Sequence, residues 1–370
     1  MTIYWLTFFV AFFSYHFSFA VNTRIVAFLL KGVAIIVPSL VAAFRDLDVG
    51  TDVATYGLKI FDLAIASSSL MNPLEIFRYQ TVEIGYIWIN LLVSYFSSSY
   101  HVLFFVLQFV VLLLTVIGCE LLKKYLKQPQ WFYLLYLLLN YCMSLSMLRQ
   151  SIAMAVFIIA IRFLLDRKFL AYSIMIFIGF LFHKSIFFVY PLYFVPSLIT
   201  KFPKAPWYAI VGCGGLGLYM FFPALLPLGI SVGLIDSKFI RYAGGEFNTH
   251  KNNMVFFAMT FLYFLYFFKT TYFSFDSQKK KILVCSLSLC AFMVELCGVY
   301  NDVASRVTKY FFLLIMVLWF DFFPAFLDKS KINKHLILLI AFMFVFFIYN
   351  AQSSRGLVNT IPYRSVILGL

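Results

Sequence analysis

The residues best suited to chemistry in this chain follow directly after an apolar run that ends at Phe44. Residues 45–52 (RDLDVGTD) hold one arginine, three aspartates and a glycine. Carboxylates can accept a proton from a hydroxyl group, and arginine binds phosphate or carboxylate groups through paired hydrogen bonds. Gly50 permits a tight turn, and Thr51 with Asp52 is predicted to cap a helix that begins near Val53. The alternative is a capped loop whose arginine and aspartates pair only with each other.

Two more polar positions lie between apolar runs. Arg149 is predicted at the start of a helix, beside the end of the preceding one, where free N–H groups and the positive end of the helix dipole suit a phosphate. The alternative is an interfacial arginine whose stem lies along apolar surface. His183 could act as a general base or a hydrogen-bond donor, although a lone histidine is also common as a polar boundary residue.

The second half of the chain adds a long loop and another polar pair. The 227–253 loop carries Arg241 and Tyr242, and its composition suits a lid or a sugar-binding loop. Asp302 and Arg306 are one helical turn apart, so they could pair with each other, and Arg306 is also a candidate phosphate contact. Glu295 lies in an apolar run, where a carboxylate indicates either function or a buried ion pair.

The composition indicates that these residues belong to a membrane protein. Of the 370 residues 63% are hydrophobic and 12% charged, against about 25% charged in soluble domains. The net charge of +14 lies mostly in short loops, which favours topology setting and contact with anionic lipid over binding of nucleic acid. The cysteines show no metal-ligand spacing, and no Walker, dinucleotide-binding or HExxH motif is present, so neither a metal nor a cofactor is expected.

The apolar runs predict an all-α polytopic protein that forms a single integral membrane domain over residues 1–370. Each span must be helical, because a lipid-exposed segment can satisfy its backbone only internally. About 20 apolar residues make a span, and the candidates are 2–20, 25–44, 101–119, 131–148, 150–165, 169–183, 185–199, 207–226, 254–270, 282–299, 307–324 and 336–350.

Clusters of basic residues predict the orientation of these spans. They recur two spans apart, which places all of them on the cytoplasmic side, together with Lys31. Residues 84–96 are too short for a comfortable span and are predicted to form an interfacial or re-entrant helix. This gives about 12 spans, with 45–100 as the first periplasmic loop and 227–253 as the second. The alternative, 13 spans, places residues 45–52 in the cytoplasm. The clusters are 123–127, 167–168, 201–204, 279–281 and 329–334.

Arginine is abundant on the opposite, outer side. Because arginine makes bidentate contacts with phosphate and carboxylate groups, this distribution indicates an anionic ligand on that face. The outer arginines are Arg45, Arg78, Arg149, Arg241, Arg306, Arg355 and Arg364.

A set of short motifs, in one order, covers almost the whole chain and resembles the Wzy-type O-antigen polymerases, specifically the EpsG-related group. The motifs are Arg45-Asp46 with Val49-Gly50-Thr51-Asp52 and Tyr56, Glu83-Ile84-Gly85-Tyr86 with Asn90, Leu148-Arg149-Gln150-Ser151-Ile152-Ala153, Phe182-His183-Lys184-Ser185, Arg306 with Tyr310-Phe311, and Ile361-Pro362-Tyr363-Arg364.

The resemblance implies a GT-C-like glycosyltransferase of the bacterial inner membrane whose active site faces the periplasm. Such an enzyme transfers a growing undecaprenyl-diphosphate-linked glycan onto the next lipid-linked repeat unit, and a chain-length regulator is a possible partner. It needs no nucleotide sugar and no obligatory metal. A flippase or transporter for lipid-linked oligosaccharide, an O-antigen ligase and a periplasmic O-acyltransferase are the alternatives.

Within this resemblance each candidate residue has an expected role. Asp52 or Asp46 is favoured over His183 as the group that takes the acceptor proton. Arg149 and Arg306, with Arg241, are expected to hold the donor diphosphate. The remaining candidates are expected to bind or orient the substrate, the tyrosines as stacking surfaces; they are Arg45, Tyr56, Glu83, Tyr86, Gln150, Tyr242, Asp302 and Arg364.

Overall fold

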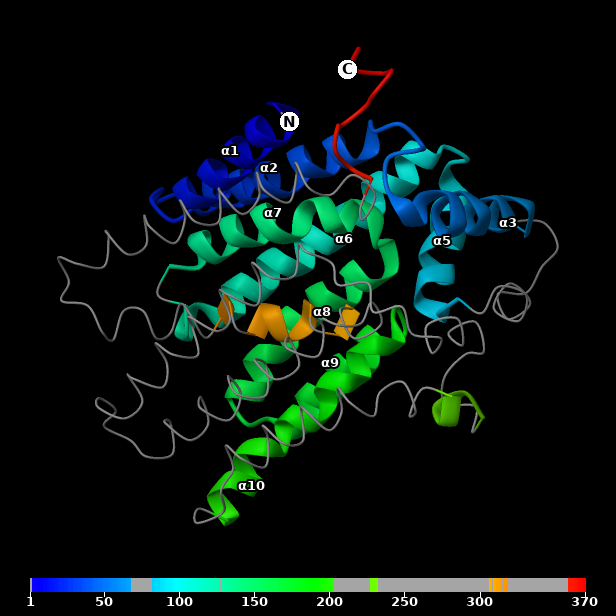
Figure 1. Ribbon diagram of the computed structural model, residues 1–370. Helices are drawn as coiled ribbons and strands as arrows, with labels where there is room; N and C mark the ends of the chain where they lie inside the picture. Colours follow the sequence, from blue (N-terminus) through cyan, green and yellow to red (C-terminus); the bar gives the residue numbers. More distant parts are fainter. Residues whose placement is uncertain are drawn as a thin grey trace. The chain divides into compact units, whose positions relative to one another are not determined.

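The computed structural model describes residues 2–67, 82–126, 128–202, 227–231, 306–307, 309–314, 316–317 and 359–370, and within these ranges all regular secondary structure is helical (Figure 1). The chain divides into two compact units, one formed by Met1–Phe187 with Trp319–Leu370 and the other by Phe188–Leu318. The candidate site lies in the first unit, and each unit is described by itself.

The first unit contains long helices that match the predicted spans to within a few residues. Three of the helices in the described part of the chain are long and apolar enough to cross a membrane: α2, α8, and α6 with the 3₁₀ turn that follows it. These helices identify a membrane protein. The bounds are α1 Thr2–Phe17, α2 Arg24–Ala43, α6 Tyr100–Leu121, α7 Pro129–Ser146, α8 Leu148–Leu165 and α9 Phe169–Phe180.

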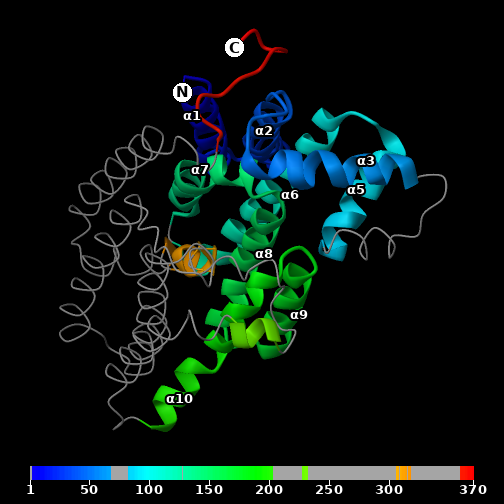
Figure 2. The same ribbon diagram turned by 45° about the vertical axis from the view of Figure 1, so that its right-hand side comes forward.

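Helix α8 forms the centre of this unit. It packs against α6 and α9, and nearly all of its residues are buried (Figure 2). A helix that is apolar on every side is typical of such a central position. Arg149, its second residue, is therefore carried on an element that the surrounding helices hold firmly in place.

A proline explains how α2 is joined to α7. Pro38 lies inside α2 and has no N–H to donate to the carbonyl of Ala34, one turn earlier. The Tyr133 hydroxyl donates to that carbonyl at 2.6 Å, and the Tyr141 hydroxyl donates to the Pro38 carbonyl at 2.6 Å. Neighbouring side chains thus satisfy the backbone group that the proline leaves free, as a membrane helix requires.

One end of the helical bundle carries acidic residues bound to the predicted cytoplasmic lysines and arginines. Lys31 lies 2.9 Å from Glu120, which also pairs with Lys123. The prediction that Lys31 shares a side with this lysine cluster is confirmed. The cytoplasmic assignment of that side remains a prediction.

The turn that follows α8 lies at the same end of the bundle. Asp166 accepts a hydrogen bond from the Tyr125 hydroxyl at 2.5 Å, and it pairs with Arg162 at 2.8 Å and Lys124 at 3.4 Å. Burial acts to raise the pKa of Asp166, but the Tyr125 hydroxyl and the two cations outweigh it, so the pKa is lowered.

The segment between α2 and α6 leaves the bundle and returns to the same end. A π-helix, η1 (Val53–Leu58), continues into α3 (Lys59–Ser67), and α5 (Ile84–Phe96) packs against α3 (Figure 1). The His101 ring, in the first turn of α6, is hydrogen-bonded to the Ala43 carbonyl at the end of α2, with 2.6 Å between Nδ1 and the oxygen. Helix α5 has the predicted bounds and 13 residues, about 20 Å against a hydrocarbon thickness of about 30 Å. This geometry suits a re-entrant or interfacial segment.

The predicted span at 185–199 is wrong as a single α-helix. A 3₁₀ helix, η3, occupies Lys184–Tyr193, and a short helix, α10, follows at Val195–Lys201. Pro191 and Pro196 explain the break, because each lacks the N–H that would continue an α-helix. The predicted spans 207–226, 254–270, 282–299 and 336–350 lie outside the described residues, and the described residues of 307–324 are helical.

Candidate functional site

Arg45 is buried where α2 ends. Its residue is 1% exposed, its guanidinium carbon lies 4.5 Å from the centroid of the Phe104 ring, and Nε has no hydrogen-bond partner among the described residues. Burial lowers the pKa of Arg45 to about 10, and the Tyr141 and Tyr4 phenols oppose that shift. The side chain is therefore charged at neutral pH, and among the described residues aromatic rings, not a carboxylate, hold it.

Asp46 and Asp48 hold the last residues of the chain. The Val366 N–H donates to Asp46 Oδ1 at 2.9 Å, and the Asp46 N–H donates to the Arg364 carbonyl at 2.9 Å. Arg364 lies 2.5 Å from the Asp48 carboxylate, and about half of each side chain is exposed. The Asn359 side chain also donates to the Asp48 carbonyl at 2.8 Å. The candidate Arg364 is thus engaged in docking the C-terminal segment onto the 45–52 loop.

Gly50 fixes the path of this loop. Its φ is +110°, and a Cβ placed there would lie 2.7 Å from the Leu145 carbonyl oxygen. Residues with a side chain rarely adopt such a φ, so only glycine fits without strain. The Thr51 N–H then donates to the Ser146 hydroxyl at 2.9 Å. The loop is anchored on the turn between α7 and α8, three residues before Arg149.

Asp52 stands where the predicted cap should be, but it does not cap the helix. The helix begins at Val53 as predicted, yet it opens as a π-helix, and the Asp52 side chain makes no capping hydrogen bond. Asp52 has helical dihedral angles, φ −84° and ψ −8°, whereas a capping residue needs an extended conformation to bring its oxygen over the first turn. The capping prediction is therefore wrong in its chemistry, although it is right in position.

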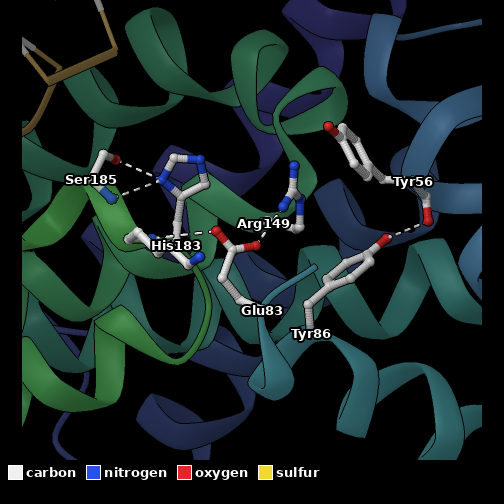
Figure 3. A network of polar contacts seen from close by, with 7 residues as sticks. Tyr56, Glu83, Tyr86, Arg149, His183 and Ser185 are labelled. Carbon is white, nitrogen blue, oxygen red and sulfur yellow. Dashed lines mark hydrogen bonds and ion pairs between the residues drawn. The ribbon is translucent and has the colours of Figure 1, made fainter. Parts of the chain in front are cut away.

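Arg149 lies at the start of α8 in a buried polar network (Figure 3). It is 8% exposed, its Nη1 donates to Glu83 Oε2, and its guanidinium carbon lies 3.7 Å from the centroid of the Tyr56 ring. Its Nε has no hydrogen-bond partner among the described residues. One face of the guanidinium is thus covered by an aromatic ring, and one of its edges is bound to a carboxylate.

Glu83 precedes α5 and lies against the end of α9. It is 7% exposed, and Oε1 accepts a hydrogen bond from the Lys184 N–H at 3.4 Å. The Gly85 N–H donates to the Leu181 carbonyl at 2.7 Å, and a Cβ on Gly85 would lie 2.7 Å from that oxygen. Only glycine lets the start of α5 approach so closely, and this approach delivers Glu83 to Arg149.

His183 lies beside the same pair (Figure 3). The Ser185 N–H donates to its Nδ1 at 3.3 Å, and the Ser185 hydroxyl lies 2.6 Å from the same nitrogen. Because Nδ1 accepts a backbone hydrogen bond, the proton of a neutral ring is on Nε2.

Tyr86 is fully buried on α5, and its hydroxyl donates to the Tyr56 carbonyl at 3.2 Å. Burial raises the pKa of this phenol, whereas the positive charge of Arg149 lowers it. Asp52 raises the pKa of the same phenol and Arg45 lowers it. The charges of all three residues thus act on one buried phenol.

The structure gathers many of the predicted site residues at one end of the first unit. They are Arg45, Asp52, Tyr56, Glu83, Tyr86, Arg149 and His183, with Gln150 buried beside Arg149 on α8. Arg306 belongs to the second unit. Arg241, Tyr242 and Asp302 lie outside the described residues, as does Glu295.

Sequence reasoning missed Phe104 beneath Arg45 and the binding of the C-terminal segment by Asp46 and Asp48. Phe104 is one of 48 phenylalanines, so nothing in the sequence marks it. The contact between Asp46 and Val366 joins residues 320 positions apart, and no local pattern signals it.

Comparison with known proteins identifies one family. A model of the EpsG family matches residues 28–365, which is most of the chain and includes every candidate residue in both units. No curated protein and no solved structure matches the chain.

Proposed function

We propose that this chain, which belongs to the EpsG family, is a membrane-embedded polysaccharide polymerase. In this proposal it is a glycosyltransferase that moves a growing undecaprenyl-diphosphate-linked glycan onto the next lipid-linked repeat unit. The single observation that carries the proposal is the pair of buried guanidiniums, Arg45 and Arg149, whose Nε atoms have no partner among the described residues.

The unused donors of these arginines favour an anionic substrate. Arg45 and Arg149 are both buried, and Glu83 binds Arg149 through Nη1 only. A buried donor without a partner is costly. A diphosphate group would bring acceptor oxygens to the two Nε atoms that lack a partner among the described residues, and its oxygens match the planar donors of arginine.

Arg149 supports a mechanism of glycosyl transfer. The acceptor hydroxyl oxygen forms a bond to the anomeric carbon of the donor, and the bond from that carbon to the diphosphate oxygen breaks. The bonding electrons leave with undecaprenyl diphosphate, whose developing charge is stabilised by Arg149. The acceptor proton passes to Asp52, favoured over Asp46 because the latter holds the C-terminal segment, with His183 as the alternative.

The two polar ends of the bundle support an orientation in the membrane. The end with Glu120 and its lysines is assigned to the cytoplasm, and the end with Arg149 to the periplasm of a bacterial inner membrane. Lipid-linked repeat units would then be joined after export, with a chain-length regulator as a possible further partner.

Reconstitution separates this activity from its rivals. The purified full-length chain is placed in liposomes with isolated lipid-linked repeat units. A polymerase extends them into a ladder of glycans on the lipid. An O-antigen ligase leaves them unextended unless a lipid A–core acceptor is added, and a flippase moves them across the bilayer without extending them. Either of these two results overturns the proposal.

A further inference from the structure

The Glu83 carboxylate is bound to Arg149, the arginine that the proposed reaction needs for the donor diphosphate. The Glu83–Arg149 pair is buried, and Tyr56 covers one face of the guanidinium at 3.7 Å. A guanidinium binds oxyanions along its edges, in its own plane. The covered face is unsuited to an oxyanion and Nη1 already holds a carboxylate, so an anionic group that approaches from the Nε side lies close to Glu83 and is repelled by it.

Glu83 depends mainly on Arg149 for its place. The other partner of its carboxylate among the described residues is the Lys184 N–H, at 3.4 Å, which is long for a hydrogen bond between nitrogen and oxygen. The carboxylate stands at the entry to α5, in an extended backbone conformation with φ −65° and ψ 139°. It therefore lies just before a separate short helix, whereas Arg149 is fixed on the central helix α8.

We propose that Glu83 is an exchange partner: it neutralises Arg149 while the site is empty and yields the arginine to the diphosphate of the lipid-linked donor. The inference rests on the proposed function and adds a step to it. A carboxylate and a diphosphate repel each other at close range, so the two cannot both bind strongly to one guanidinium group. After transfer, Glu83 recaptures Arg149 and helps to expel undecaprenyl diphosphate.

If Glu83 exchanges with the diphosphate, loss of its charge should raise the affinity for a diphosphate. If Glu83 only holds Arg149 in place, the same change should lower that affinity. Glu83→Gln keeps the shape of the side chain and the acceptor for the Lys184 N–H, but it removes the competing charge. We expect this variant to bind a diphosphate about tenfold more tightly than the wild-type chain does. Turnover should fall because product leaves slowly, so KM and kcat fall together.

The probe for binding is farnesyl diphosphate, which joins the diphosphate to a short isoprenoid. Affinity is measured on the full-length chain in detergent, at a temperature at which every variant is folded. The matched control is Asp48→Asn, which removes one negative charge from an exposed ion pair with Arg364 and should leave affinity unchanged. Glu83→Asp keeps the competing charge and should bind close to the wild-type level, whereas Arg149→Ala should lose binding.

The outcomes separate the exchange from the function on which it rests. Weaker binding by Glu83→Gln overturns the exchange, because it means that Glu83 only holds Arg149 in place for the ligand. Tighter binding by Asp48→Asn to the same degree also overturns it, because net charge alone then explains the gain. If neither the wild-type chain nor Arg149→Ala binds farnesyl diphosphate, the proposed diphosphate site is itself refuted, and the exchange with it.

Discussion

Removal of the Arg149 charge should destabilise the protein more than removal of both charges of its pair. Arg149→Met leaves Glu83 buried at 7% exposure without its cation. Breaking a buried pair in this way costs about 3–5 kcal/mol, because a charge remains buried without compensation. Glu83→Gln likewise leaves Arg149 buried without its carboxylate, and the expected loss in the free energy of unfolding is of the same order. The double variant buries neither charge, so it should be more stable than either single variant.

The assay is a double-mutant cycle on the purified chain in mixed micelles, with unfolding followed by tryptophan fluorescence. The Asp48–Arg364 pair is the matched control, since both of its side chains are half exposed. An exposed pair contributes about 0–1 kcal/mol, so Asp48→Asn with Arg364→Gln should show little coupling. If Arg149→Met is as stable as the wild-type chain, or if the two cycles give equal coupling, the Glu83–Arg149 pair is not a buried ion pair and the reasoning fails.

Three further substitutions test other parts of the structure. Gly50→Ala should destabilise the chain by at least about 1 kcal/mol, because φ is +110° and the added methyl meets the Leu145 carbonyl. Gly32→Ala is the control, because a methyl group added there has nothing within 4 Å. Equal free energies of unfolding for the two variants would contradict the loop geometry. Asp166→Asn should be less stable than the wild type above about pH 4, and the difference should shrink as the pH falls through the lowered pKa of the Asp166 carboxyl, because that carboxyl stabilises the fold only while it is ionised. A constant difference across a pH titration of stability would refute this. Tyr56→Leu should impair polymerisation more than Tyr56→Phe, which keeps the ring over the guanidinium; equal loss in a glycan-ladder assay would exclude the ring contact.

The long helices could be predicted because each coincides with an apolar run in the local sequence. Residues 84–96 are apolar between polar neighbours, and α5 has these bounds. The shared side of Lys31 and Lys123 also followed from charge, since short loops between spans alternate sides. Pro191 and Pro196 indicate the break within 185–199, but the high hydropathy of this segment favoured one continuous span.

The contacts within the site depend on tertiary structure and left no local signal. Glu83 and Arg149 are 66 residues apart and meet because Gly85 lets α5 approach the end of α9. The sequence placed both in the site as separate contacts, without their pairing. Tyr56 was expected to stack on sugar, and its ring covers the Arg149 guanidinium. Which aromatic ring meets which cation is decided by packing, and a chain with 21% aromatic residues offers too many choices.

The most direct test of the central claim is a gel of surface polysaccharide from cells in which the gene for this chain has been deleted. Cells complemented with the wild-type chain should show a ladder of repeat units. Cells with the deletion, or with Arg149→Met inserted at wild-type level, should show single repeat units and no ladder. A full ladder in the deletion strain, or in cells that rely on Arg149→Met, would contradict the account. Complete loss of surface repeat units from the deletion strain, with lipid-linked units accumulating inside, would assign the chain to export or ligation instead.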